Sequence, residues 1–200
     1  MFVKGQLNRD LVIEKAAELI ETVGLDEMTL SRLAKELGIK SASLYNHIGS
    51  INDLRSSLTA KSMQLLGEAC RNAVVGKSGD EAILAMAYAY RKFAKMKPQL
   101  YKAFMQNSLL SQAERIQHGA LLTQTLERLM EPYGYNEKEA LHIARGIRVF
   151  LFGFVYMGDG GFFKSTKASV DMSFEYLMKE LIAHIRDHQV ESGKKPSALL

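Results

Sequence analysis

The sequence has little cysteine and proline. Its 200 residues contain one cysteine, Cys70, and three prolines. A single cysteine excludes an intramolecular disulfide and a zinc site with several thiolate ligands, and it fits a reducing compartment. So few prolines, together with 47% apolar and 24% charged residues, exclude a disordered or collagen-like chain. The composition therefore predicts a folded globular protein that is large enough to bury a substantial core.

Signals for export or membrane insertion are also missing. The first ten residues hold no apolar segment of signal-peptide length. The longest apolar stretch, 149–158, has ten residues and contains a glycine, whereas a membrane-spanning helix needs about 18 or more. We therefore expect a cytoplasmic protein that is not embedded in a membrane.

The net charge of +4 is unevenly distributed along the chain. Residues 1–60 carry 7 Lys and Arg against 8 Asp and Glu, residues 61–110 carry 8 against 3, and residues 111–200 carry 11 against 11. A basic patch is the usual electrostatic footprint of nucleic-acid binding, and here the basic excess lies in the middle of the chain. Any DNA-binding function therefore has to be argued from local geometry.

Helical periodicity dominates the segments between turn signals, and runs of β-branched residues are almost absent, which predicts an all-α protein. Expected N-caps are Thr29, Ser41 and Asp80, and capping-box spacing is found at Ser50–Asp53 and Asn136–Glu139. With glycine and proline positions as stops, the predicted helices span 8–23, 29–37, 41–47, 51–74, 80–96, 98–107, 111–131, 137–157 and 169–188.

These helices predict an N-terminal three-helix domain that a long helix joins to a larger helical C-terminal domain. We place the N-terminal helix-turn-helix domain at 1–50 and the connecting helix at 51–76. The C-terminal domain, expected to bind a ligand and to dimerise, spans 77–190, and a flexible tail covers 191–200.

The stretch 29–50, TLSRLAKELGIKSASLYNHIGS, has the pattern of two short helices that cross at a steep angle. Such a crossing needs a small residue at the contact, a turn residue that tolerates positive φ, and apolar residues that fix the angle. These needs are met by Ala34, by Gly38 and by the trio Leu33, Ile39 and Leu44. The pattern predicts a helix-turn-helix whose second helix enters the DNA major groove, although an ordinary helical hairpin has similar spacing.

Several residues occur at fixed spacings within 8–58: Gly24, Thr29, Leu33–Ala34, Gly38–Ile39, Ser43–His47 and Asp53–Leu54. With them, this segment resembles the N-terminal domain of the TetR family of transcriptional regulators. Two positions depart from the family pattern. Ile48 stands where the family often has phenylalanine, and Ile51 stands where it commonly has a lysine that can meet phosphate. The first change preserves apolar volume, whereas the second removes one contact with the DNA backbone.

The resemblance implies a DNA-binding surface on and around the second helix of this motif. Hydroxyl, amide and phenol groups donate to phosphate oxygens, and Ala42 is small enough to touch a thymine methyl group. For Tyr45 the alternative is a half-buried packing role, and His47 is expected to bond phosphate or backbone rather than to titrate as a switch. The residues assigned to DNA are Thr29, Arg32, Lys40, Ser41, Ala42, Ser43, Tyr45, Asn46 and His47.

The segment 80–190 shows no nucleophile with its base, no phosphate-binding glycine loop and no convincing set of metal ligands. We therefore expect no enzymatic activity, no cofactor and no metal. Glu139 and His142 have the spacing found in di-iron bundles, but such a site needs a second copy. Glu114 and His118 are four residues apart, so the copy is missing and a metalloenzyme is a distant alternative.

Aromatic and methionine side chains cluster in the same segment. Plain core packing explains any one of them, but such clusters also line cavities for apolar ligands, and the resemblance implies a small-molecule effector in this domain. The residues predicted to bind the effector are Tyr88, Tyr101, Phe104, Met105, Arg145, Phe150 and Phe154.

The last two predicted helices are apolar on two faces, and such a helix needs a second partner. Gly146 and Gly153 lie near one stripe, where they would admit another helix closely, although Gly153 would alternatively open the pocket. In the TetR family these helices form a two-fold dimer. The sequence thus predicts a homodimeric repressor that binds palindromic double-stranded DNA and is released by a small molecule. The alternative is a helical small-molecule-binding protein without DNA binding.

Overall fold

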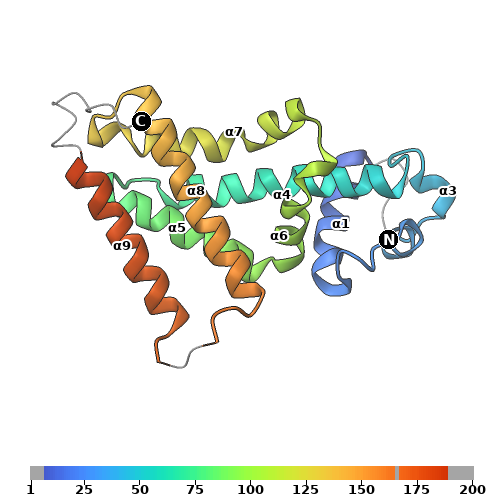
Figure 1. Ribbon diagram of the computed structural model, residues 1–200. Coiled ribbons are helices and arrows are strands. Elements are labelled where there is room, and N and C mark those ends of the chain that lie inside the picture. The colour runs from blue at the N-terminus through green and yellow to red at the C-terminus, as the bar shows by residue number, and fades with distance from the viewer. Residues whose placement is uncertain (1–6, 165–166, 189–200) are drawn as a thin grey trace. The chain divides into compact units, whose positions relative to one another are not determined.

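The computed structural model describes residues 7–164 and 167–188, and over these residues the chain is helical with no β-strand (Figure 1). The predicted all-α fold class is confirmed, and the predicted tail at 191–200 lies outside the described residues. The α-helices are α1 (Arg9–Val23), α2 (Leu30–Glu36), α3 (Ser41–Leu44), α4 (Ile51–Ala73), α5 (Gly79–Met96), α6 (Pro98–Met105), α7 (Gln112–Arg128), α8 (Glu137–Asp159) and α9 (Val170–His188). Two short 3-10 helices are η1 (Asn107–Leu109) and η2 (Glu131–Tyr133).

The helices divide into two compact units. The first unit comprises the residues up to Gly67 together with Phe93–Ala120, and the second comprises Glu68–Lys92 together with the residues from Leu121 onward. Helices α4, α5 and α7 therefore each contribute residues to both units. The domain boundaries expected from the sequence, which separate a DNA-binding motif from a connecting helix, stay a prediction.

The first unit has its core where α1, α2, α3, α6 and the start of α4 meet. Helix α1 begins at Asn8, whose side chain accepts a hydrogen bond from the Leu11 N–H at 2.8 Å. It ends at Gly24, whose φ of 89° suits a glycine stop. The buried core residues are Val12, Ala16, Ala17, Ile20, Leu25, Met28, Leu33, Ala34, Leu37, Leu44, Ile48, Leu54, Leu58, Leu100 and Ala103.

Polar side chains hold α6 within this unit. The Glu21 carboxylate accepts from the Leu100 N–H at 2.9 Å, so a negative charge meets the first turn of α6. Buried hydroxyls of α4 donate to carbonyls of α6: Thr59 donates to the Ala103 carbonyl at 3.1 Å, and Ser62 donates to the Leu100 carbonyl. Because these buried hydroxyls are satisfied, they add specificity to the packing without a desolvation penalty.

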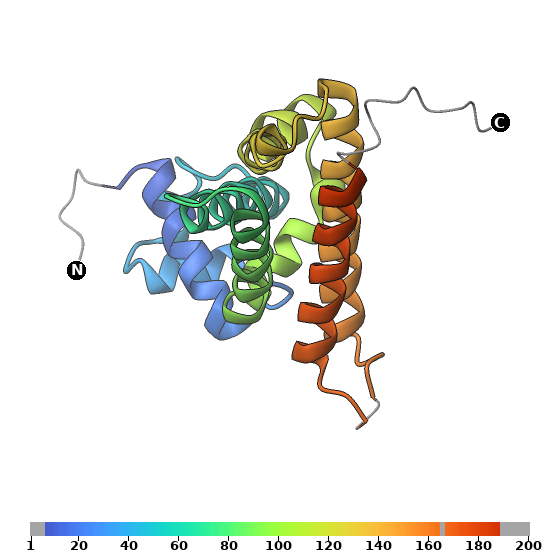
Figure 2. The same cartoon turned by 90° about the vertical axis from the view of Figure 1, so that its left-hand side faces the viewer.

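The second unit contains α8 and α9, which run side by side and antiparallel (Figure 2). The capping box predicted at the start of α8 is confirmed, with Asn136 and Glu139 bonded reciprocally at 3.0 and 3.1 Å. The Phe174 ring on α9 is fully buried, and its centroid lies 5.8 Å from that of Tyr88 on α5. Aromatic packing thus joins α5 to α9 within this unit.

Two N-caps predicted from the sequence are wrong. Lys40 has the extended backbone of an N-cap (φ −70°, ψ 142°), so Ser41 is the first residue inside α3. Asp80 lies within the first turn of α5 rather than before it. Its carboxylate instead accepts from the Tyr133 hydroxyl at 2.5 Å and from Arg186 at 2.7 Å. Partners more than 50 residues away therefore determine the role of Asp80.

Helix α3 is also shorter than predicted, because it ends at Leu44 rather than near His47. The next amides bond three residues back, from Asn46 to the Ser43 carbonyl at 3.4 Å and from His47 to the Leu44 carbonyl at 2.9 Å. The chain therefore tightens into turns immediately after one turn of α-helix.

Among the described residues, α8 alone is long and apolar enough to cross a membrane by length and composition. Of its most apolar stretch, 33% is buried inside the protein. One such helix is weak evidence for a membrane span, because core helices of soluble proteins have the same composition.

Candidate functional site

The turn between α2 and α3 has the hydrogen-bond pattern of a Schellman motif. The Gly38 N–H donates to the Lys35 carbonyl at 3.1 Å, and the Ile39 N–H donates to the Ala34 carbonyl at 3.0 Å. Gly38 has a φ of 67°, a left-handed conformation that costs other residues strain because they carry a Cβ. The tolerance of positive φ predicted for Gly38 is therefore confirmed, and the turn directs the chain into α3.

The inner side of α3 is fixed by buried apolar side chains. Leu33 and Leu44 are fully buried, Ala34 is 1% exposed, and the half-buried Ile39 packs against the same core. A single turn of helix is not stable in water on its own. Helix α3 therefore depends on this core for its conformation, which leaves its other side facing solvent.

The side chains predicted to bind DNA belong to α3, to the residues that flank it and to the start of α2. Tyr45 is 57% exposed, so the alternative packing role does not apply to it, and His47 is half-buried. The other predicted DNA-binding residues are all exposed: Thr29, Arg32, Lys40, Ser41, Ala42, Ser43 and Asn46.

Two of these residues, Thr29 and Arg32, also make hydrogen bonds at the start of α2. The Thr29 hydroxyl accepts from the Arg32 N–H at 3.2 Å, which confirms the predicted N-cap. The Arg32 guanidinium donates to the Glu27 carbonyl at 3.1 Å. Their contacts with DNA stay a prediction, as do those of the residues on α3.

An arginine outside the motif ties α1 to the residues that follow α3. The Arg9 guanidinium donates to both carboxylate oxygens of Asp53, at 3.0 and 2.5 Å, to the His47 carbonyl at 2.7 Å and to the Ser57 hydroxyl at 2.9 Å. Asp53 also accepts from the Gly49 N–H at 2.8 Å. This Arg9–Asp53 pair therefore holds the end of the helix-turn-helix against the first turn of α4. Sequence reasoning gave Asp53 a capping role and missed Arg9.

The same contacts shift the pKa values of both groups. The hydrogen bond from Arg9 lowers the pKa of the Asp53 carboxyl, and the hydrogen bond to Asp53 raises the pKa of Arg9. Because the Asp53 pKa is lower in the folded state than in the unfolded state, ionised Asp53 stabilises the fold above its unfolded pKa of about 4. This stabilisation is lost as the pH falls through the lower folded-state pKa.

We expect Arg9→Gln to lower the free energy of unfolding at pH 7 by about 1 kcal/mol, because a bidentate, charge-assisted pair is lost whose strength is reduced by the 46% exposure of the Arg9 side chain. Urea unfolding at pH 7 and pH 3 should show the difference from wild type shrinking at the lower pH. Lys15→Gln breaks an exposed pair with Glu18 within α1 and is the matched control. Equal stability of Arg9→Gln and wild type at pH 7 would contradict the structural role of the Arg9–Asp53 pair.

Ile51, the position where the TetR pattern commonly has lysine, is the first residue of α4. Its side chain is half-buried and packs against the core of the first unit. Ile51 therefore contributes apolar packing at this position, and the expected loss of one contact with the DNA backbone stays a prediction.

The seven residues predicted to bind an effector do not all line one cavity. Phe150 and Phe154 line a cavity in the second unit. The following residues do not line it: Tyr88, Tyr101, Phe104, Met105 and Arg145. Three of them, Tyr101, Phe104 and Met105, belong to the first unit, where the Tyr101 and Phe104 ring centroids lie 5.6 Å apart. Their role as effector contacts stays a prediction.

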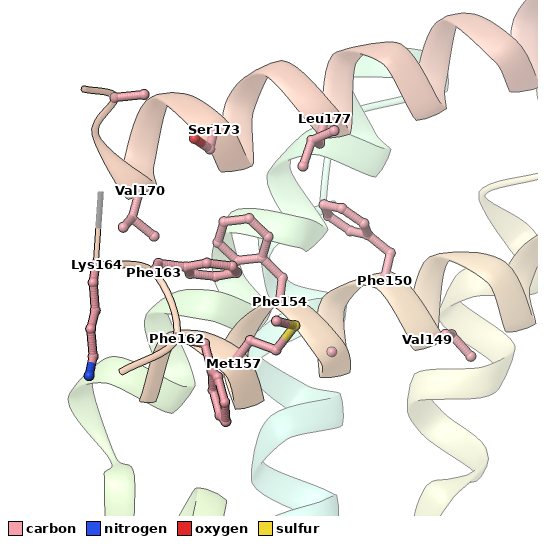
Figure 3. A pocket seen from close by; sticks show the side chains of 12 residues that line it. Val149, Phe150, Phe154, Met157, Phe162, Phe163, Lys164, Val170, Ser173 and Leu177 are labelled. Carbon is pink, nitrogen blue, oxygen red and sulfur yellow. The ribbon is translucent and has the colours of Figure 1, made fainter. Parts of the chain in front are cut away.

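The cavity has a volume of about 630 Å³ and lies between α8, the segment after it and α9 (Figure 3). Phe163 and Phe154 point toward one another inside it, with Leu177 above them on α9. The remaining lining residues are Val149, Phe150, Gly153, Met157, Phe162, Lys164, Ala168, Val170 and Ser173. Sequence reasoning missed the contribution of Phe162 and Phe163, for which the adjacent Gly160–Gly161 turn was the available signal.

No metal site is formed by the part of the chain that the structure describes. Glu114 and His118 line a polar groove of about 600 Å³ in the first unit, together with Asp53 and Lys61. Among the described residues no group of three His, Cys, Asp or Glu side chains is placed to hold a metal ion.

Helices α8 and α9 also present large apolar side chains to solvent in the single chain. Val149 on α8 is 72% exposed and Tyr176 on α9 is 64% exposed. We call the exposed set the apolar α8–α9 face: Val149, Phe152, Tyr156, Met157, Met172, Tyr176 and Leu177. On α8, a Cβ added at Gly146 or Gly153 would meet no atom within 4 Å. Large exposed apolar patches are common at the interaction surfaces of proteins.

A helix-turn-helix in one unit and a helical second unit are the architecture of helix-turn-helix transcriptional regulators, and comparison with known proteins agrees. Residues 12–58 match the family described as "Bacterial regulatory proteins, tetR family", and residues 83–181 match "Tetracyclin repressor-like, C-terminal domain". The HTH-type transcriptional regulator YobS of Bacillus subtilis (strain 168) is 30% identical over 152 residues, which are 76% of this chain and 78% of YobS.

Solved structures share the fold. A protein of unknown function from Rhodococcus sp. RHA1 has a TM-score of 0.74 and 20% identity, covering 88% of this chain and 94% of that one. A variant of TetR from Acinetobacter baumannii AYE in complex with minocycline has a TM-score of 0.67 and 20% identity, covering 92% and 99%. The chain belongs to the TetR family of transcriptional regulators, a family of DNA-binding proteins rather than enzymes.

Proposed function

We propose that the chain is a cytoplasmic transcriptional repressor without catalytic activity, which binds a palindromic operator as a homodimer and leaves it when a small-molecule effector binds. The observation that carries this proposal is the two-sided character of α3. Its inner side chain Leu44 is fully buried, while Ala42, Ser43 and Tyr45 are exposed. A helix held rigidly from behind presents short polar and apolar side chains in a fixed register, as major-groove readout requires.

The homodimer is supported by the apolar α8–α9 face. A two-fold interface uses the same patch on both protomers, so one exposed apolar face is sufficient to form it. Gly146 and Gly153 add no side chain to the α8 surface and therefore permit close approach of a helix from a second copy. A two-fold dimer carries two copies of α3 and so matches a palindromic DNA site.

Effector control follows from a shift in conformational populations. A ligand that binds more tightly to a dimer whose two α3 helices are wrongly spaced lowers operator affinity by the factor by which it discriminates between the conformations. Coupling free energies of this kind are typically about 1–3 kcal/mol. A ligand in the cavity beside the apolar α8–α9 face would lie next to the proposed dimer interface, where it could change the spacing of the two protomers.

Lys40→Ala is expected to weaken binding to operator and to random DNA alike. Lys40 is exposed at the N-cap of α3 and is assigned to a phosphate contact. Without this lysine, DNA binding releases one fewer counterion per half-site, which lowers the magnitude of the slope of log K against log salt by about 0.9 per half-site. Fluorescence anisotropy titrations between 50 and 200 mM salt, conditions over which such slopes are resolved, provide the measurement. Lys179→Ala removes the same charge from α9 and should leave the slope unchanged. A loss confined to the operator would reassign Lys40 to a base contact.

Gel-shift titration of the full chain against fragments of its own genome tests the proposed function. A DNA-binding regulator should retard one or a few fragments in the presence of excess random DNA. A chain that shifts no fragment under any salt condition, but is stabilised by small molecules, would instead be the ligand-binding protein without DNA binding.

A further inference from the structure

We propose that the cavity between α8, the segment after it and α9 binds one neutral, apolar molecule per chain. This inference deepens the proposed function, because it assigns the effector a site and a chemical class. It is argued from the cavity itself, so it does not depend on any DNA contact.

The cavity has a wall of aromatic rings that is already assembled. The Phe154 centroid lies 5.0 Å from that of Phe163 and 5.7 Å from that of Phe150. Behind them the fully buried Phe174 lies 5.1 Å from Phe154 and 6.0 Å from Phe150. Rings that support one another in this way keep their places when the cavity is empty, so an apolar ligand loses little affinity to reorganisation.

The polar groups at the cavity do not converge on its centre. Ser173 donates its hydroxyl to the Ser169 carbonyl at 3.2 Å, within α9 and the residue before it. Figure 3 shows the Lys164 side chain along the rim, with its amine directed away from the aromatic rings. Among the described lining residues, the aromatic wall offers no partner to a charged group, which would lose hydration when buried against it, so this wall favours a neutral ligand.

The cation that lies over two of these rings already has a partner. The Arg91 guanidinium lies 4.8 Å from the Phe174 centroid and 5.6 Å from the Phe154 centroid, and it pairs with Asp171 at 2.5 Å. Arg91 does not line the cavity. It therefore steadies the aromatic wall rather than offering a site for an anionic ligand.

The size and position of the cavity suit a small-molecule ligand. A volume of about 630 Å³ lies within the range of about 300–1,000 Å³ that is usual for small-molecule sites. Val149, Met157 and Leu177 line the cavity and are also exposed, so the cavity opens beside the apolar α8–α9 face. An occupant would then touch the second protomer of the proposed dimer, which gives it a direct route to dimer geometry.

The test compares two fluorescent probes that share one ring skeleton. N-phenyl-1-naphthylamine is neutral, and 8-anilino-1-naphthalenesulfonate is the same skeleton with a sulfonate. Titration of the full chain, without DNA, should show one neutral probe bound per chain with at least tenfold higher affinity than the sulfonate. Equal or tighter binding of the sulfonate would overturn the assigned class, and the absence of neutral-probe binding would overturn the site.

Gly153→Leu locates the probe. Gly153 lines the cavity and a Cβ there meets no atom within 4 Å, so leucine fills the space without a clash at its Cβ. Gly146→Leu is the matched control, because it places the same side chain two helical turns earlier on the same α8 surface, so an effect on the proposed dimer is common to both variants and only Gly153→Leu enters the cavity. Neutral-probe affinity should fall at least tenfold further in Gly153→Leu than in Gly146→Leu, with oligomeric state followed by light scattering.

Each outcome of this pair decides the proposal. Equal losses in both variants would place the probe at the α8–α9 face between copies, and unchanged binding in Gly153→Leu would place it elsewhere; either result overturns the cavity site. Operator binding is measured separately in the absence of probe, so failure of the cavity leaves the DNA-binding proposal intact.

Discussion

Replacing Ala42 with glutamate is expected to lower the operator affinity of the dimer about a hundredfold while leaving the fold intact. Ala42 is exposed on the outer side of α3, so a larger side chain meets solvent rather than the core. In the complex it would bring a carboxylate against the negative potential of the groove. We expect a cost of at least tenfold per half-site, about 1.4 kcal/mol, and the two half-sites of a palindrome add.

Fluorescence anisotropy with operator DNA measures the affinity, and thermal unfolding checks the fold. Gln112→Glu is the matched control, because it adds the same charge in the first turn of α7, at an exposed position of the first unit. A melting temperature within a few degrees of wild type is expected for both variants. Unaltered operator affinity in a folded Ala42→Glu dimer would show that α3 is not the reading helix.

The second large effect concerns the apolar α8–α9 face. We expect Tyr156→Glu combined with Tyr176→Glu to convert the dimer into a folded monomer, because two charges per protomer would be buried at the interface without partners. Both tyrosines are exposed in the single chain, so the core is not disturbed. Neither tyrosine lines the cavity, which keeps this test separate from ligand binding. Operator affinity should fall by about 100-fold or more, since the two half-site contacts are no longer linked.

Val75→Glu is the control for this pair, because Val75 is 75% exposed in the same unit but lies outside α8 and α9. It should leave both the dimer and operator binding unchanged. Light scattering that shows an unaltered dimer for the double variant would move the interface to another surface.

Capping and turn residues made much of the fold predictable from the sequence. Thr29 caps α2, Gly38 takes the left-handed conformation after it, and Asn136 and Glu139 cap α8 reciprocally. Each signal acts over three or four residues, and the hydrogen bonds involved are available within that span. The prediction of an all-α chain with a helix-turn-helix rested on signals of this range.

Interactions between distant segments were beyond the reach of such patterns. Asp80 has the composition of an N-cap, but the structure places Tyr133 and Arg186 beside it. Arg9 is an exposed residue in the first turn of α1, and its sequence neighbours do not indicate a structural role. The role depends on Asp53, which is 44 residues away in the sequence and pairs with Arg9 in the folded chain. In both cases tertiary contacts determine what a locally ambiguous side chain does.

The cavity illustrates the same limit at the candidate site. Helical periodicity distinguishes the buried side of α8 from the exposed side, and it placed Phe150 and Phe154 near a pocket. It does not show which other segments complete the wall. Phe163 enters the cavity from the segment after α8, whereas Tyr101 and Phe104 belong to the first unit. The sequence composition indicated one cluster of aromatic and methionine residues, whereas in the folded chain these residues are divided between the two units.

The central claim is that a two-fold dimer reads palindromic DNA through α3, and selection of bound fragments from genomic DNA followed by footprinting tests it most directly. Our account predicts an enriched inverted repeat, with two half-sites separated by a whole number of helical turns of about 10 bp each, protected together by wild type. The same sites should be unprotected by Ala42→Glu. Recovery of no common sequence, or of a single asymmetric site protected equally by Ala42→Glu, would contradict the account.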